Sequence, residues 1–402
     1  MRKAYLRAVR KSSLFGFILA FGAAVAASGC GRDPSLNGVA EVAAAAAAVA
    51  GRPGPAPPPV PRPYPSARDR VYASEDIRIG MLDFFALKRC GIRGEVADRN
   101  SILGKLAEAS RRLPYEHALV LGLEACVARL ADDPEDDDPA FAATIAEALE
   151  AVRSRLPAIR WNAGFGSDEF AASFRVGAGP LPAGVSTAQA QKSALETLAQ
   201  AIGSLGKADA AIDRKRVVDA QETLEKGRYG ARLHRSLAAA THYLRDAAES
   251  VDLVSSQGCP AESLARIRAT MVDVRLVPWL DELEARGEAW FRGIAALAAV
   301  SPPPPPGFRT WATEELYPSA RDGRWQKFLA ARAAFTGALA RCADVSAPAG
   351  NAGYPPTASL GRERKARPIS PGDAVRRQVR SSQSSSGSHW LTSRLKRGSS
   401  NS

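Results

Sequence analysis

Apolar residues recur at intervals of three or four positions through most of residues 70–345, which places them on one face of an α-helix. The longest pattern covers about three heptad repeats. Its positions are Leu233, Leu237, Ala240, Leu244, Ala247, Val251 and Val254, and a shorter pattern consists of Phe141, Ile145, Ala148, Val152 and Leu156. No segment alternates apolar and polar residues over the length of a strand. The sequence therefore predicts an all-α fold, either an antiparallel helical bundle or two packed helical bundles.

A proline interrupts the next long apolar pattern, which lies within residues 264–297. The apolar positions before the proline are Leu264, Ile267, Met271 and Val274. Pro278 lacks an amide hydrogen and clashes with the preceding helical turn. We therefore expect a kink at Pro278 and a shift in the phase of the apolar stripe.

The segments on either side of the predicted helical domain, residues 70–345, differ in composition. Residues 30–69 contain a run of alanines followed by a proline-rich stretch at positions 53–63. Because proline fixes φ and lacks an amide donor, we expect an extended, semi-rigid tether that holds the folded domain away from a membrane surface. Residues 346–402 are rich in Ser, Arg, Gly and Pro, so we expect a disordered basic tail.

The first 29 residues have the layout of a secretory signal peptide, with basic residues, an apolar run and then small residues. They lead into Ala27-Ser28-Gly29-Cys30, which resembles the lipobox of bacterial lipoproteins. On that resemblance Cys30 is lipidated and becomes the mature N-terminus, and Gly31 favours sorting to the outer membrane. Two alternatives stay open: cleavage after Ala26 would release a soluble periplasmic protein, and residues 12–29 left uncleaved would be a membrane anchor.

The net charge of +12 would ordinarily suggest a nucleic acid or an anionic surface as a partner. Most of the excess lies near the two termini. Residues 1–29 carry five basic and no acidic residues, and residues 351–402 carry ten basic and two acidic residues. Residues 30–350 therefore have a net charge of −1. We expect no nucleic-acid partner, and contact with a membrane through the lipid anchor at Cys30.

Four cysteines remain besides Cys30, and export would place them in a compartment where disulfides persist. Four cysteines permit three pairings. We favour Cys90 with Cys126 and Cys259 with Cys342, because each pair joins the end of one predicted helix to another. Buried free thiols are the alternative. A metal site is not predicted, because there is no C-x-x-C spacing and no histidine close to a cysteine.

The sequence contains no motif that names a reaction. It has no G-x-S-x-G elbow, no H-E-x-x-H helix and no Walker loop. His234 and His242 share one predicted helix but lie eight residues apart, so they cannot hold a metal as an i, i+4 pair would. We interpret both, and His117, as surface or hydrogen-bonded core residues, and we predict no cofactor and no metal.

One group of polar residues is less ordinary, because many hydrogen-bonding side chains gather near a predicted helix start. It consists of Glu95, Arg99, Asn100, Ser101, Tyr115 and Glu116. Such a group can line a ligand cleft or form a buried ion-pair network. Helix capping and a solvated face are the simpler interpretation.

The same region carries a distinctive order of motifs. They are Leu82-Asp83-Phe84-Phe85-Ala86-Leu87, Arg89-Cys90-Gly91, Glu95, Arg99-Asn100-Ser101, Leu103-Gly104, Tyr115-Glu116 and Glu124-Ala125-Cys126. This order resembles an uncharacterised family of proteobacterial lipoproteins, domain of unknown function 3080, and the segment around Pro278 is similar to a later block of that family. The resemblance implies an envelope lipoprotein with cysteines at these places. It supplies no activity, cofactor or catalytic residue.

We interpret the chain as a lipid-anchored, periplasm-facing protein of the outer membrane that binds or scaffolds an unknown envelope protein or ligand. The alternative is a hydrolase-like envelope enzyme that uses the polar cluster from Glu95 to Glu116. A concave pocket containing Glu95, Arg99, Asn100 and Tyr115 would favour the enzyme. Outward-facing side chains would favour the scaffold.

Overall fold

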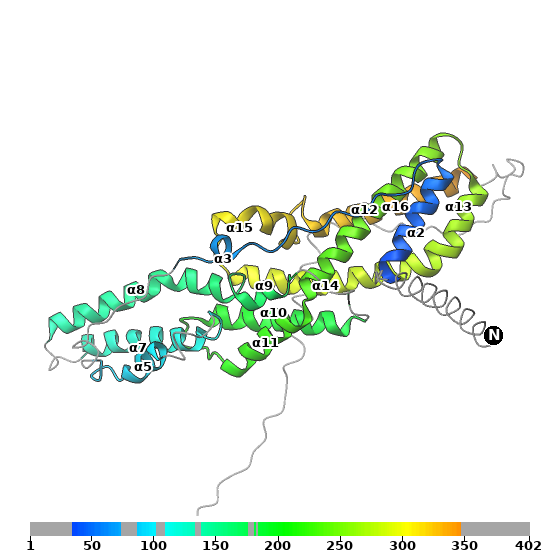
Figure 1. Cartoon of the computed structure of the whole chain (residues 1–402). Coiled ribbons are helices and arrows are strands. Elements are labelled where there is room, and N and C mark those ends of the chain that lie inside the picture. Colours follow the sequence, from blue (N-terminus) through cyan, green and yellow to red (C-terminus); the bar gives the residue numbers. More distant parts are fainter. Residues whose placement is uncertain are drawn as a thin grey trace, which may run out of the picture. The chain divides into compact units, whose positions relative to one another are not determined.

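The computed structural model describes residues 34–73, 87–101, 109–132, 138–175, 181 and 184–346. Every regular element in these ranges is a helix (Figure 1), so the prediction of an all-α fold is confirmed. Residues 1–348 form one unit, and the second unit, residues 349–402, contains no described residue. The expected signal peptide, the expected lipidation site at Cys30 and the expected tail beyond residue 346 lie outside the described ranges.

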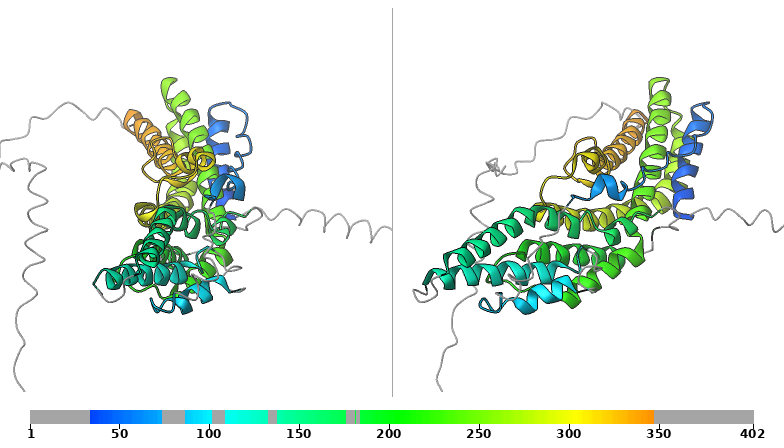
Figure 2. Two further views of the ribbon diagram at one scale, coloured as in Figure 1. Left: turned by 90° about the vertical axis from the view of Figure 1, so that its left-hand side faces the viewer. Right: turned by 60° about the vertical axis from the view of Figure 1, so that its left-hand side comes forward.

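Long helices that pack side by side build the main hydrophobic core (Figure 2). Helix α12, Tyr229–Ser256, packs against α16, Arg324–Ser346, and against α2, Pro34–Val49. Helix α10, Ser186–Ser204, packs against α14, Val277–Val300, and against α11, Arg214–Gly227. The whole apolar stripe predicted on α12 is buried in this core, as a face of that width requires.

A second hydrophobic core lies between α5, Arg93–Asn100, α7, Leu113–Asp132, and α8, Pro139–Ala163. Three positions of the stripe predicted on α8 are buried there, namely Phe141, Ile145 and Val152. Leu156, one turn further along, packs against both cores. Helix α8 therefore joins the two cores.

Both disulfides that the sequence favoured are present. Cys90 pairs with Cys126 beside the smaller core, with Cα atoms 5.1 Å apart. Cys259 pairs with Cys342 of α16, with Cα atoms 5.6 Å apart. Each bridge ties a residue outside the described helices to a residue within one, α7 for Cys126 and α16 for Cys342.

Short polar side chains mark helix starts. Asp138 accepts a hydrogen bond from the backbone N–H of Phe141 at 3.0 Å and so caps α8. That bond, helped by Arg89, lowers the pKa of Asp138 below its ordinary value.

The remaining helices are α3, Ala67–Arg70, α9, Asp168–Ala172, α13, Ala261–Ile267, and α15, Pro306–Trp311, with the π-helices η1, Arg268–Leu276, and η2, Ala312–Leu316.

The kink predicted at Pro278 corresponds to a change of helix type. Helix α13 passes into the π-helix η1, and α14 begins at Val277, with Pro278 in its first turn. A π-helix bonds residue i to i+5, so each residue turns through a smaller angle and the apolar face shifts. The buried position predicted at Val274 is therefore wrong: that residue is 66% exposed, whereas Val272 and Leu276 are buried.

The tether expected at residues 30–69 is not separate from the folded part. Within it, α2 lies alongside α12 and buries Val39, Val42 and Ala43 (Figure 2). Alanine has the highest helix propensity, and the valines add an apolar face. The expectation of a detached tether is wrong for this segment, because the apolar face of α2 packs against α12.

The proline-rich stretch forms no helix, as expected, but it lies on the folded part. Directly after it, the Tyr64 hydroxyl donates to the Phe165 carbonyl at 2.6 Å. Further back, the carbonyl oxygen of Ala56 is 2.8 Å from His242 Nε2. These contacts contradict the expectation of a spacer that holds the folded domain away from a surface.

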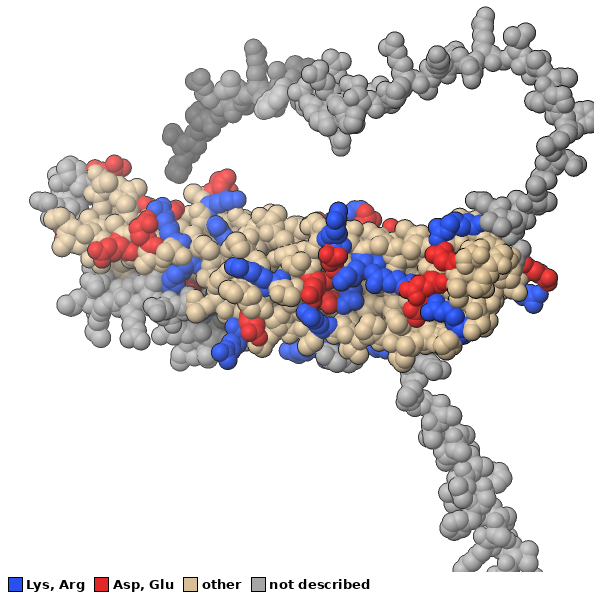
Figure 3. Space-filling model, turned by 90° about the horizontal axis from the view of Figure 1, so that it is seen from above, with Lys and Arg blue, Asp and Glu red and all other residues tan. Residues whose placement is uncertain are grey.

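None of the described helices has both the length and the apolar composition needed to cross a bilayer. Within the described ranges, no group of three or more His, Cys, Asp or Glu side chains is placed to hold a metal ion. On the face drawn in Figure 3, basic and acidic side chains lie intermixed. That distribution agrees with the net charge of −1 on residues 30–350.

Candidate functional site

A groove lies between α2, the proline-rich stretch and α12. Its volume is about 770 Å³, which is within the range of small-molecule sites. Its walls are mostly apolar, with Leu36 from α2, Val60 from the proline-rich stretch, and Ala239 and Tyr243 from α12. The polar lining residues are Asn37, Glu41, Arg62, His234 and Arg235.

His234 is the most deeply buried of the polar lining residues, at 2% exposure. It follows Leu233 on α12 and so borders the apolar stripe. The ring of Phe174 meets it edge-on at 5.0 Å between centroids, and the indole of Trp311 is stacked on it at 6.3 Å. Aromatic packing from two other segments therefore fixes the plane of the imidazole.

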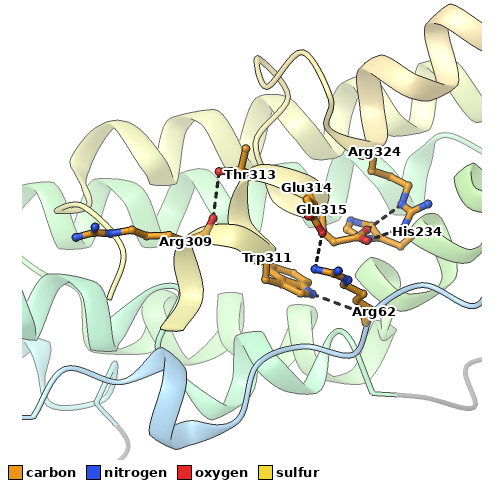
Figure 4. Close-up of polar contacts among 8 residues, drawn as sticks. All are labelled: Arg62, His234, Arg309, Trp311, Thr313, Glu314, Glu315 and Arg324. Carbon is orange, nitrogen blue, oxygen red and sulfur yellow. Dashed lines mark hydrogen bonds and ion pairs between the residues drawn. The ribbon is translucent and has the colours of Figure 1, made fainter. Parts of the chain in front are cut away.

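Two charged residues from other helices hold one side of the imidazole (Figure 4). Glu315 lies in η2, and Arg324 begins α16. Glu315 Oε2 is 3.4 Å from His234 Nδ1. Both carboxylate oxygens of Glu315 also accept hydrogen bonds from Arg324, at 2.8 and 2.6 Å. Because Glu315 is only 4% exposed, this is a buried, two-pronged ion pair.

Burial sets the protonation state of this group. Burial lowers the pKa of His234 below its ordinary value, and the opposing effect of the neighbouring Glu315 carboxylate does not restore it. For Glu315, burial alone would raise the pKa, but the hydrogen bond with His234 and the charge of Arg324 outweigh it and lower the pKa. At neutral pH the site therefore holds a neutral imidazole beside an ionised carboxylate.

The carboxylate also selects the tautomer of the imidazole. A carboxylate accepts hydrogen bonds, so His234 Nδ1 carries the proton and donates to Glu315. Nε2 is then an acceptor, and it is buried without a hydrogen-bond partner. Such an orphaned acceptor costs about 1–3 kcal/mol.

The proline-rich stretch is fastened beside this histidine (Figure 4). The Arg62 guanidinium lies 2.6 Å from Glu314 Oε2, next to Glu315 in η2. The Trp311 indole N–H donates to the Arg62 carbonyl at 3.4 Å. The same short segment, α15 and η2, thus orients His234 and holds one wall of the groove.

A second cavity, of about 760 Å³, shares Pro63 and Phe174 with the groove. Several of its charged residues already have partners: Arg70 donates to the Gly166 carbonyl and forms an ion pair with Asp168, and Arg175 lies 4.0 Å from Glu225. The arginine and carboxylate side chains of its lining are present in equal number. We assign no ligand to it.

The polar cluster predicted near Glu95 forms a buried ion-pair network, one of the two arrangements that the sequence indicated besides helix capping. Arg99 Nε donates to Glu116 Oε1 at 3.0 Å, and Arg112 donates to the same oxygen at 3.2 Å. Arg99 and Glu116 are 6% and 1% exposed. Arg99 lies on α5 and Glu116 on α7, so the network fastens these helices together.

The other members of the cluster do not converge on a pocket. The Ser101 hydroxyl donates to the Asp98 carbonyl at 2.7 Å, at the end of α5. The Tyr115 hydroxyl accepts from Arg214 at 3.0 Å. Glu95 is half-buried, and the side chain of Asn100 lies outside the described part. Neither cavity described above contains a member of the cluster.

The other two histidines of the helical part have ordinary partners. His117 Nδ1 accepts from the Gly206 N–H at 3.2 Å, and its Nε2 is 2.9 Å from the Ala210 carbonyl oxygen. His242 contacts the proline-rich stretch and Asp246. The interpretation of these residues as hydrogen-bonded histidines agrees with the structure. His234 differs, because one of its nitrogens has no partner.

Sequence reasoning missed Glu315, Arg324 and the groove. Glu315 lies far from His234 along the chain, and no motif links them. The one local signal was a histidine beside the apolar stripe of α12, which is also typical of a structural core histidine. The groove itself depends on α2, which the sequence analysis placed in a tether.

Fold and groove together define an all-helical, disulfide-bonded protein with an apolar groove that contains one oriented imidazole. The model of the family described as "Protein of unknown function (DUF3080)" matches residues 48–338, so the chain belongs to that family. No curated protein and no solved structure matches the chain. The resemblance predicted from the motifs around Cys90 and Cys126 is confirmed.

Proposed function

We propose that the protein is a lipid-anchored, periplasm-facing component of the bacterial cell envelope that binds an apolar molecule in the groove between α2 and α12. The molecule has an apolar body that fits the groove walls and one hydrogen-bond donor for His234 Nε2. The observation that carries this proposal is the buried, unpartnered Nε2 of an imidazole that Glu315 orients.

The chemistry of the groove supports binding over hydrolysis. A nucleophilic hydrolase needs a hydroxyl or thiol within hydrogen-bond reach of its base. Within the described part of the chain, no such group reaches His234 Nε2. The polar cluster from Glu95 to Glu116, the other candidate for an enzyme site, consists largely of groups that already bond to each other or to nearby backbone.

Three features support an envelope location. Residues 1–29 have the layout of a signal peptide, and Cys30 follows small residues as in a lipobox. The two disulfides, Cys90–Cys126 and Cys259–Cys342, are of a kind that persists in oxidising compartments such as the periplasm.

Titration with N-phenyl-1-naphthylamine tests the binding proposal. This fluorescent molecule has an apolar body and a single N–H donor, and its emission rises in apolar surroundings. We expect saturable binding to the purified protein. The variant His234→Phe keeps a ring in place but removes the acceptor, and one hydrogen bond contributes about 1 kcal/mol, so binding should weaken about fivefold.

The control is Ser236→Ala, which removes a polar group from another face of α12. Ser236 is 3% exposed and does not line the groove. The affinity of the Ser236→Ala variant for the probe should match that of the parent protein. Absence of saturable binding to the parent, or equal affinity in His234→Phe, would refute the proposed site. Helical circular dichroism of each variant verifies its fold.

Lipidation is tested separately by labelling cells with a palmitate analogue. We expect the parent chain to take up the label and Cys30→Ala to lose it, because the thioether and amide linkages both need that cysteine. Label retained by Cys30→Ala would show that the lipobox prediction is wrong.

A further inference from the structure

We propose that the junction of η1 and α14 rests directly on an anionic phospholipid bilayer, with Val274 and Val277 at the lipid surface. This inference rests on the proposed lipid anchor at Cys30. It concerns the face of the folded part that meets the membrane, which neither the anchor nor the groove specifies.

The proposed anchor at Cys30 has a short reach. Helix α2 begins at Pro34, four residues after Cys30. Four residues span at most about 14 Å when fully extended. A lipid on Cys30 therefore keeps the start of α2 close to the bilayer, whatever path the intervening residues take.

Helix α2 is firmly attached to the rest of the fold. Val39 and Val42 are 1% and 2% exposed, and α2 packs against α12 and η1. Further along, Arg52 donates to Ser250 of α12 at 3.2 Å. Helix α2 is therefore not a flexible arm, and the membrane must lie next to whatever surrounds its first turn.

The surroundings of that first turn include the junction of η1 and α14. Helix α2 begins beside the place where η1 passes into α14, as Figures 1 and 2 both show. Here Val274 is 66% exposed and Val277 is 37% exposed. The other exposed large apolar side chains of the described part, Val60, Val71, Val185 and Leu253, are each separated from one another along the chain.

The charges at this junction suit a lipid headgroup region. Arg275 is exposed between the two valines, and Arg268, about half exposed, precedes them with Asp273 as its partner at 3.5 Å. Asp273 offsets Arg268, so Arg275 supplies the positive charge of this turn, and one such charge near an anionic bilayer contributes about 1 kcal/mol. None of the described helices can cross the bilayer, so the contact is superficial.

The π-helical geometry of η1 explains why Val274 is exposed. In a regular α-helix, Val274 would continue the apolar stripe of Leu264, Ile267 and Met271. The π-helical turns of η1 bring Val272 and Leu276 into the core instead. Val274 is thereby turned outward at the end of the fold that the anchor holds near the membrane.

Lipid quenching of a site-specific fluorophore tests the contact. The full-length, lipidated chain is reconstituted into vesicles of phosphatidylethanolamine and phosphatidylglycerol, with bimane on Val274→Cys or Val277→Cys. The control is Val71→Cys, which replaces a valine of 38% exposure, matched to the 37% of Val277, in a different part of the fold. Some of the lipids carry a nitroxide in the headgroup region.

We expect the nitroxide lipids to remove about half or more of the bimane emission at positions 274 and 277 and little of it at 71, because interfacial side chains lie within about 5–10 Å of that depth. Flotation of the vesicles reports the anchor separately. Protein that floats but shows equal quenching at all three positions overturns the contact and leaves the anchor intact. Protein that does not float overturns both.

Discussion

The proposed ligand preference of the groove between α2 and α12 depends on one imidazole, that of His234. His234 is surrounded by apolar and aromatic side chains, and its one strong partner, Glu315, takes the Nδ1 proton. Burial keeps the ring neutral, so Nε2 is an acceptor and not a cation at neutral pH. On the proposed function, this neutral acceptor favours a ligand that carries a hydrogen-bond donor.

The lowered pKa of His234 predicts how stability depends on pH. The unfolded imidazole, with its ordinary pKa of 6.5, takes up a proton before the folded one does. The stabilisation from this residue is complete above that value and is lost as the pH falls toward the lower pKa of the folded state. We expect the free energy of unfolding to fall from pH 7 to pH 5.5, by at most about 1.4 kcal/mol per pH unit from this group.

Urea unfolding at several pH values measures this slope. His234→Phe should flatten it, because the titrating group is gone. Glu315, whose pKa is also lowered, acts at more acidic pH, since its unfolded value is 4.5, so the two contributions separate. An unchanged slope in His234→Phe would assign the pH dependence to other residues.

At the scale of elements, close packing between helices depends on small residues at defined places. Gly287 of α14 faces the indole of Trp325 at the start of α16, and a Cβ atom at position 287 would overlap that indole. Trp325 is 8% exposed and packs against Phe291 and Phe328. The glycine therefore makes room for the Trp325 indole, next to the Arg324 of the site.

Gly287→Ala should destabilise the protein. Replacing a helical glycine by alanine contributes about 0.8–1.0 kcal/mol of helix propensity, but overpacking a core costs about 1–3 kcal/mol. We expect the cost of overpacking to exceed the gain in helix propensity, so the free energy of unfolding measured with urea should fall by about 1 kcal/mol. Gly38→Ala is the matched control: Gly38 lies in α2, and its Cβ would meet nothing within 4 Å. That variant should gain stability, and an equal gain in Gly287→Ala would contradict the packing argument.

At the scale of the whole molecule, sequence patterns predicted the features that local periodicity determines. The stripe of α12 and the all-α fold follow from residue spacing, and the pairing of Cys259 with Cys342 followed from their places at helix ends. The packing of α2 was missed, because a run of alanines is compatible with either a helix or a linker. Only the packing of α2 against α12 distinguishes the two. The π-helix before Pro278 was missed in the same way, since its register depends on what Val272 and Leu276 pack against.

The candidate site depends on contacts between distant segments, and these have no local signature. Residues from α2, the proline-rich stretch, α12 and η2 meet only in the folded chain. The polar cluster near Glu95 did have a local signature, and that signature proved to be structural, since Arg99 and Glu116 pair with each other. The gathered polar residues therefore form a contact between α5 and α7, whereas the groove is lined by a histidine that the sequence indicated only as a surface or core residue.

The most direct test of the central claim is the nitrogen NMR spectrum of His234 with and without N-phenyl-1-naphthylamine. In the free protein, we expect Nδ1 to be protonated and Nε2 to have the resonance of an unprotonated imidazole nitrogen, assigned by its absence in His234→Phe. Saturating probe should shift the Nε2 resonance in the direction of an accepted hydrogen bond and leave Nδ1 in place. An Nε2 resonance that does not move when the probe is bound would contradict the account.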